Sequence, residues 1–107
     1  MRGRKPERVI DVNALTNRER MVLELLAAGL SNRQIGKELG IRETTARTYV
    51  DHIMEKMYLP NRTTLAAAAI LYGMVSLERI RDLMHRYHPY LAESVPPGYI
   101  ILMEACN

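Results

Sequence analysis

Residues 32–50 read NRQIGKELGIRETTARTYV and contain two helical patterns separated by a glycine. A capping box over residues 31–34, in which two side chains accept hydrogen bonds from backbone N–H groups of the first turn, begins a short helix. Gly40 ends this helix, because glycine adopts the positive φ angles of tight turns at little cost. A second helix is expected over about residues 42–57. The stretch therefore predicts a helix, a tight turn and a longer helix.

The second helix has one apolar and one polar side. Its apolar residues recur every three or four positions and form a continuous stripe: Ala46, Tyr49, Val50, Ile53, Met54 and Met57. The opposite side carries Thr44, Arg47, Thr48, Asp51 and Glu55. Gly36, in the middle of the first helix, leaves room for the second helix to cross closely. Packing of the stripe then holds the polar side outward, as a helix-turn-helix that enters the major groove requires.

Three more helices are expected in the rest of the chain. These helices are expected over residues 17–28, 62–72 and 77–87, and their N-cap residues are Thr16, Asn61 and Ser76, respectively. On the last of them Leu77, Ile80, Met84 and Tyr87 are in register to face the core. Residues 99–103 form a short β-prone run. We therefore expect an all-α fold with four helices, an extra C-terminal helix and a short extended tail.

The composition limits the classes of protein. The chain has 107 residues, of which 48% are hydrophobic and 25% charged, so there is room for one folded domain. No run reaches the roughly 20 apolar residues of a membrane helix, and a single cysteine rules out a disulfide framework within the chain; both favour a cytoplasmic protein. The net charge of +3 is concentrated in residues 1–8 and 31–62. Two basic regions favour a partner rich in phosphate, such as nucleic acid.

A longer pattern surrounds the helix-turn-helix. It runs from Leu15-Thr16-Asn17-Arg18-Glu19-Arg20 through Leu25-Leu26-Ala27-Ala28-Gly29-Leu30-Ser31-Asn32, Ile35-Gly36 and Glu38-Leu39-Gly40-Ile41 to Lys56 and Arg62. This pattern resembles the LuxR/GerE-type DNA-binding domains over residues 15–75, without gaps. The resemblance implies a four-helix module whose third helix enters the major groove and whose fourth helix forms a homodimer. It also implies a bacterial transcription regulator that binds double-stranded DNA.

The resemblance assigns roles to individual residues. It places Arg47, Thr48 and Asp51 toward base edges. Near phosphates or at the rim it places Asn32, Arg33, Thr45, Tyr49, His52, Lys56 and Arg62. The chemistry agrees for two of the base readers, because Arg47 can donate two hydrogen bonds to guanine and the Thr48 methyl can touch a thymine methyl. Asp51 stands where a basic or neutral residue is common in the family, and Tyr58 stands where glycine is frequent.

The predicted fourth helix lies in a segment without charge, between Arg62 and Glu78. It is apolar on all sides, so one face can join the core while another remains for self-association. The candidate dimer contacts are Leu65, Ala68, Ala69 and Tyr72. The alternative is a helix wholly buried in its own domain. At the other end of the chain, Arg2 and Arg4 resemble the short arginine arms that enter the minor groove of DNA.

These features divide the chain into a basic N-terminal arm (1–14), a helix-turn-helix DNA-binding domain (15–75) and a C-terminal extension (76–107). The arm is too short for a receiver or ligand-binding domain, so a stand-alone regulator is expected. The extension has four possible roles: to lengthen the dimer interface, to pair tail to tail, to dock on a partner, or to cover an apolar surface of the module.

Two other functions have less support from the sequence. The sequence shows none of the usual groups of catalytic residues. His85 and His88, near Asp82, have metal-ligand spacing but lack an obvious third metal ligand, and Cys106 has no activating neighbour. We therefore expect no enzyme activity, metal or cofactor. The rival function is a protein-interaction module that binds another regulator or RNA polymerase through the same scaffold, because the carboxylate of Asp51 suits DNA poorly.

Overall fold

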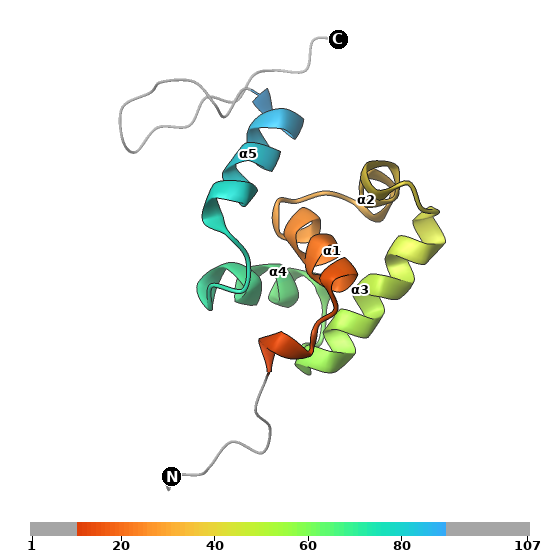
Figure 1. The fold of residues 1–107 in the computed structure, drawn as a ribbon, viewed down its shortest axis with the longest axis vertical. Coiled ribbons are helices and arrows are strands. Elements are labelled where there is room, and N and C mark those ends of the chain that lie inside the picture. Colours follow the sequence, from red (N-terminus) through yellow and green to blue (C-terminus); the bar gives the residue numbers. More distant parts are fainter. Residues whose placement is uncertain (1–10, 90–107) are drawn as a thin grey trace, which may run out of the picture.

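A computed structural model describes residues 11–89 of the chain (Figure 1). Its elements are the 3-10 turn η1 (Val12–Ala14) and the helices α1 (Asn17–Ala27), α2 (Asn32–Leu39), α3 (Glu43–Met57), α4 (Arg62–Leu71) and α5 (Leu77–Tyr87). Within these residues the fold is all-α, as the sequence predicts. The predicted minor-groove arm with Arg2 and Arg4, the β-prone run 99–103 and Cys106 lie outside the described residues.

The predicted caps form, and they explain where the helices begin. Thr16 and Glu19 make a reciprocal capping box at α1, and Ser31 and Gln34 make a second one at α2. At α4 and α5 the side chains of Asn61 and Ser76 accept the N–H groups of Thr64 and Arg79, at 2.8 and 3.2 Å. α3 begins after Arg42 without a side-chain cap. Four of the five helices therefore start at hydrogen bonds between residues three positions apart.

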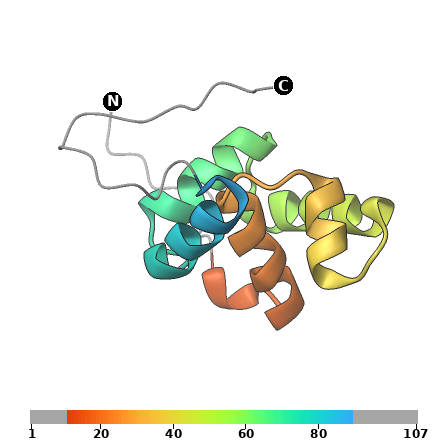
Figure 2. The same ribbon diagram turned by 90° about the horizontal axis from the view of Figure 1, so that it is seen from above.

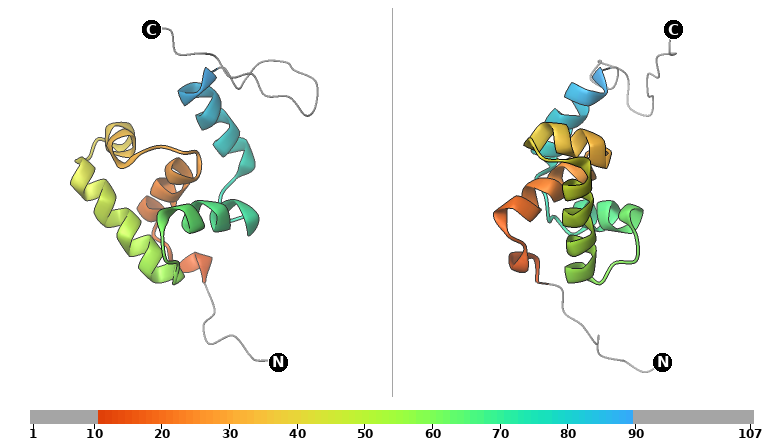
Figure 3. Two further views of the ribbon diagram at one scale, coloured as in Figure 1. Left: turned by 180° about the vertical axis from the view of Figure 1, so that it is seen from behind. Right: turned by 90° about the vertical axis from the view of Figure 1, so that its right-hand side faces the viewer.

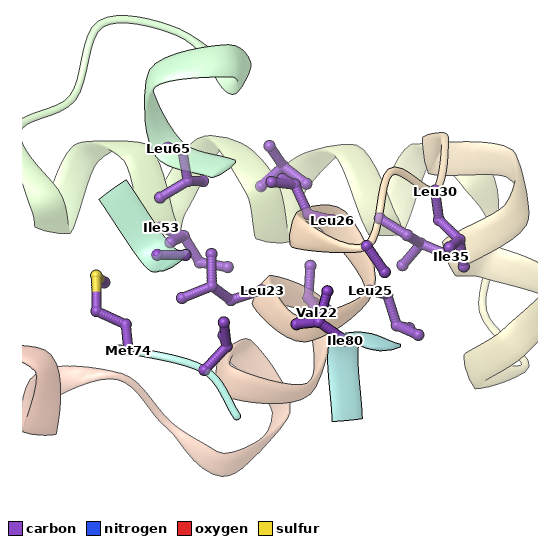
Figure 4. Close-up of a cluster of buried hydrophobic side chains, with 14 of the residues drawn as sticks. Val22, Leu23, Leu25, Leu26, Leu30, Ile35, Ile53, Leu65, Met74 and Ile80 are labelled. Carbon is purple, nitrogen blue, oxygen red and sulfur yellow. The ribbon is translucent and has the colours of Figure 1, made fainter. Parts of the chain in front are cut away.

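Helix α1 is the centre of the core, and it contacts all four other helices. Figure 2 shows it between α3 on one side and α5 on the other. The cluster joins residues of all five helices, including Val22, Leu23, Leu25, Leu26, Ile35, Ile53, Leu65 and Ile80 (Figure 4). No helix among residues 11–89 is both long enough and apolar enough to span a bilayer.

The turn between α2 and α3 depends on two glycines. Gly40 has a φ of 69° and ends α2 in the left-handed conformation, as predicted. Gly36 is needed for a different reason: a Cβ atom there would lie 2.7 Å from the carbonyl oxygen of Ile41. Tyr58 ends α3 with a φ of 56°, which explains why glycine is frequent at this position of the family.

Helix α5 packs against the module rather than projecting from it. Its Ile80 and Leu83 belong to the same core as α1. The prediction that Leu77 faces this core is wrong, because its side chain is 66% exposed and the buried Met74 and Val75 of the preceding connection fill that end of the core instead. Leu83, one turn after Ile80, is fully buried and was not among the residues predicted to face the core.

Two carboxylates of the module hold α5 in place. Glu38 of α2 accepts a hydrogen bond from the Tyr87 hydroxyl and forms an ion pair with Arg86 at 3.2 Å. The hydrogen bond to this carboxylate raises the pKa of Tyr87. Glu24 of α1 lies 3.8 Å from the guanidinium of Arg79. The extension helix is thus joined to both α1 and α2.

Candidate nucleic-acid interface

The outer side of α3 is open to solvent in the described part of the chain. Arg47, Thr48 and Asp51 are all exposed, and α3 runs along one edge of the molecule, with α5 beyond α1 on the far side (Figure 1). Figure 3, in its right-hand view, looks onto this edge. The inward side is fixed by four buried residues, Ala46, Val50, Ile53 and Met57. The polar side of α3 is therefore held outward by core packing, as the sequence predicts.

The three predicted base readers offer different chemistry on one surface. Arg47 and Asp51 are four residues apart and so are neighbours on the helix. Within residues 11–89, however, Arg47 forms no ion pair with Asp51 or with any other carboxylate. The Thr48 hydroxyl donates to the carbonyl of Thr44 at 3.1 Å. That bond engages the hydroxyl, so the methyl group is what Thr48 offers to a ligand. The surface thus combines a cation with five donors, a methyl group and a carboxylate.

The residues predicted to contact phosphates fall into two groups. Arg33, Thr45 and His52 are exposed, and Tyr49 is half-buried beside the core. Lys56, Arg62 and Asn32 instead make hydrogen bonds within the chain, described below. Sequence patterns on one helix do not reveal such partners, because the partners are 30 to 42 residues away.

Arg62 joins the start of α4 to the start of α2. Its guanidinium donates to the Asn32 side chain and to the carbonyl of Leu30, both at 2.6 Å. Burial lowers the pKa of Arg62, and the two hydrogen bonds offset part of the cost of burying its charge. Arg62 therefore positions the N-terminus of α2, which includes Asn32, a predicted phosphate contact.

Lys56 joins the end of α3 to the start of α1. Its ammonium group lies 2.7 Å from the carboxylate of Glu19 and donates to the carbonyl of Ala14 at 3.2 Å. Glu19 is the buried charged residue of the described chain. Burial raises the pKa of its carboxyl, but the hydrogen bonds from Lys56 and Thr16, with the charge of Lys56, outweigh this and hold the pKa below its ordinary value.

This arrangement predicts how stability depends on pH. Because the pKa of Glu19 is lower in the folded chain, its contribution to stability is complete above the pKa of the unfolded chain and is lost as the pH falls through the folded pKa. We expect Lys56→Gln to be less stable than the natural chain at pH 7, with a difference that narrows as the pH falls through the folded pKa of Glu19, because the natural chain then loses this contribution. Urea unfolding at several pH values between 7 and 3 measures both effects.

The control is Lys37→Gln, which removes an equally charged but exposed side chain from α2. We expect this variant to follow the natural chain at every pH. Equal acid sensitivity of the two lysine variants would contradict the role of the Lys56–Glu19 pair.

The candidate dimer residues of α4 do not share one face. Leu65 and Ala69 are fully buried in the core of the same chain, which corrects their prediction as contacts to a second copy. Ala68 is half-buried and Tyr72 is 74% exposed. The exposed stripe of α4 consists of Thr63, Ala67, Ile70 and Leu71. Because α4 is apolar on all sides, its sequence could not show which face is buried.

Comparison with known proteins agrees with this architecture. Residues 13–69, more than half of the chain, match the GerE family, described as bacterial regulatory proteins of the luxR family. The nitrate/nitrite response regulator protein NarL of Escherichia coli (strain K12) is 46% identical over 56 residues, which are 52% of this chain and 26% of that protein. The transcriptional regulatory protein DesR of Bacillus subtilis (strain 168) is 44% identical over 52 residues, 49% of this chain and 26% of DesR.

A longer match is found with the transcriptional regulatory protein DegU of Brevibacillus brevis, 39% identical over 66 residues, which are 62% of this chain and 28% of DegU. The chain thus spans about a quarter of the length of these curated relatives. The family match includes the whole helix-turn-helix, α2 and α3, with the capping boxes and the glycines described above. The chain belongs to the luxR family of bacterial regulatory proteins.

Proposed function

We propose that the chain regulates transcription by binding double-stranded DNA, with α3 in the major groove and two copies on paired half-sites. The observation that carries the proposal is the exposed side of α3, which is held outward by four buried residues behind it. Membership of the luxR family and the names of the relatives, which are regulatory proteins, support it further.

In this proposal Arg47 reads a guanine through two hydrogen bonds, and the Thr48 methyl contacts a thymine. Asp51 accepts from a cytosine amino group or orients a neighbouring cation. Arg33, Thr45, Tyr49 and His52 hold the DNA backbone. Lys56, Arg62 and Asn32 fix the helices that carry these groups, because their hydrogen bonds lie within the chain.

Selection from random duplexes at near-physiological salt tests the proposal. An enriched inverted repeat supports DNA reading by a symmetric pair, since the symmetry of the site mirrors that of the protein. Recovery of no preferred sequence, together with tight capture of RNA polymerase or of another regulator, would favour the protein-interaction module instead.

Arg47→Ala is expected to weaken binding to the selected duplex by about 1–3 kcal/mol, because a bidentate contact to guanine is worth that much. Affinity for random duplexes should change far less, since phosphate contacts dominate it. Fluorescence anisotropy with both duplexes at one salt concentration measures the difference.

The matched control is Arg81→Ala, which removes an exposed arginine from α5, far along the chain from α3. We expect it to leave both affinities nearly unchanged. A loss for Arg47→Ala that is equal on selected and random DNA would assign Arg47 to the phosphates rather than to the bases.

The exposed stripe of α4 gives the expected dimer surface. Ala67→Glu places a carboxylate in the middle of that stripe, and in a twofold interface two such charges approach each other. We expect affinity for the inverted repeat to fall by about tenfold or more, which corresponds to about 1.4 kcal/mol, while binding to a single half-site is kept. Sedimentation with each duplex and titration of both duplexes measure this, and Arg81→Glu on α5 serves as the control. Unchanged pairing of Ala67→Glu would place the dimer surface elsewhere.

A further inference from the structure

The connection between α4 and α5 carries a concentration of exposed apolar side chains. Of the six large hydrophobic residues that are exposed in the described chain, four lie within residues 70–77: Ile70 (41%), Leu71 (73%), Tyr72 (74%) and Leu77 (66%). We call residues 70–77 the α4–α5 corner. Scattered exposed hydrophobic residues are normal, but four within eight residues of chain are typical of an interaction surface.

The corner is a fixed surface rather than a loose loop. The backbone N–H of Met74 donates to the carbonyl of Ala69 at 2.8 Å, and that of Gly73 donates to the carbonyl of Ile70 at 3.3 Å. Met74 and Val75 are buried and anchor the turn from below. The exposed apolar side chains are therefore presented on a backbone that core packing holds in place.

We propose that residues 99–103 of the same chain, Tyr-Ile-Ile-Leu-Met, cover the α4–α5 corner. These five residues are uncharged and apolar, and the segment from 63 to 77 is also uncharged, so the contact buries no charge on either side. This proposal goes beyond the proposed function, because the contact lies within one chain and needs no DNA.

The length of the intervening chain allows the contact. Helix α5 has 11 residues and is therefore about 16 Å long, so the chain leaves it about that far from Leu77. Nine residues, 90–98, separate Pro89 from Tyr99, and the ten steps along the backbone between these two residues can span up to about 33 Å. The sequence Pro96-Pro97-Gly98, directly before the apolar run, is typical of a turn. The run can therefore come back along α5 to the corner.

The tether favours this segment over a second copy of the corner. Because nine residues join it to the end of the described chain, the run stays within reach of the corner at any protein concentration, whereas a second copy must be recruited from solution. Charge does not favour either occupant, because the first turns of α5 carry two charges of each sign: Glu78, Arg79, Arg81 and Asp82. Because the proposed dimer stripe includes Ile70 and Leu71, pairing on DNA would displace the tail from these two residues.

The natural chain allows a direct test, because Cys106 is its only cysteine and lies three residues after Met103. A nitroxide label on Cys106 broadens the NMR signals of amides that come near it. In DNA-free solution we expect broadening at residues 70–77 and none at the outer surface of α3 around Thr48. Absence of broadening at residues 70–77 overturns the proposal.

A mixed sample separates the two possible occupants. Labelled chains without 15N are combined with unlabelled 15N chains, so that broadening reports only contacts between chains. We expect no broadening of residues 70–77 in this sample. Broadening there would show that the tail covers the corner of a second copy, which overturns the contact within one chain.

Matched variants complete the test. Ile101→Asp places a charge in the apolar run and is expected to abolish the broadening, whereas Ser94→Asp adds the same charge outside the run and should preserve it. Equal behaviour of the two variants overturns the proposal. Arg47→Ala should leave the broadening unchanged, so a failure of DNA binding and a failure of the tail contact are distinguished.

Discussion

Ile53→Ala is expected to lower the free energy of unfolding by about 4 kcal/mol, toward the upper part of the range of about 2–5 kcal/mol for such truncations. Ile53 is fully buried, on the side of α3 that faces α1. The substitution removes three carbon atoms and leaves a cavity that the surrounding helices fill only in part. Domains of this size are stable by about 5–15 kcal/mol in total, so this one change removes a large share. Urea unfolding followed by circular dichroism measures it.

The chain provides a matched control for this prediction. Ile70→Ala makes the same chemical change on α4, where the side chain is 41% exposed, and should cost less than about 1 kcal/mol. Because both variants replace isoleucine by alanine, the difference between their stability losses measures the effect of burial alone. A similar loss for both variants would mean that α3 is not anchored at Ile53, and the outward orientation of Arg47 would then lack its physical basis.

Gly36→Val is expected to destabilise the chain by about 3 kcal/mol, at the upper end of the range for overpacking. A Cβ atom at Gly36 would lie 2.7 Å from the carbonyl oxygen of Ile41 and 3.4 Å from backbone atoms of Arg42 and Glu43. These are backbone atoms, which cannot move aside as the end of a flexible side chain can. The turn and the first residue of α3 must shift instead, and with them the exposed surface of α3. Urea unfolding measures the loss of stability, and the affinity for a selected duplex measures the shift.

The direction of the stability change on a smaller substitution gives a sharper test. Replacing a glycine by alanine inside a helix normally stabilises the helix by about 0.8–1 kcal/mol. Without the close contact to Ile41, Gly36→Ala would therefore stabilise the chain; because of that contact, we expect Gly36→Ala to destabilise it. Lys37→Val places the same branched side chain at the next, exposed position of α2 and should change stability by less than about 1 kcal/mol. A stabilised Gly36→Ala variant would contradict the close approach of the turn to α2.

The sequence alone predicted the helices and their order because their signals are local. The capping boxes at Thr16 and Ser31, and the caps at Asn61 and Ser76, involve residues three positions apart. The stripe of α3 repeats every three or four residues, so its buried side follows from the period of the helix. For the same reason the exposure of Arg47, Thr48 and Asp51 could be predicted, since they lie opposite that stripe.

The partners of charged side chains could not be predicted in this way. The resemblance to the LuxR/GerE-type domains placed Lys56 and Arg62 near phosphates or at the rim. The structure gives them Glu19, Ala14, Leu30 and Asn32 as partners. The one local hint was Glu19 itself, which lies in the first turn of α1 on the same side as Val22 and Leu23, three and four positions later, and so requires a partner once buried.

The sequence by itself determined the five helices, their caps, the glycine turn between α2 and α3, and the outward side of α3, because each depends on neighbours within about one or two helical turns. Only the tertiary structure decided which face of α4 is buried, that Leu83 rather than Leu77 joins the core, and that Glu38 and Glu24 hold α5 against the module. These features depend on where separate helices meet, and a helix that is apolar on all sides, such as α4, carries no periodic signal to choose between its faces.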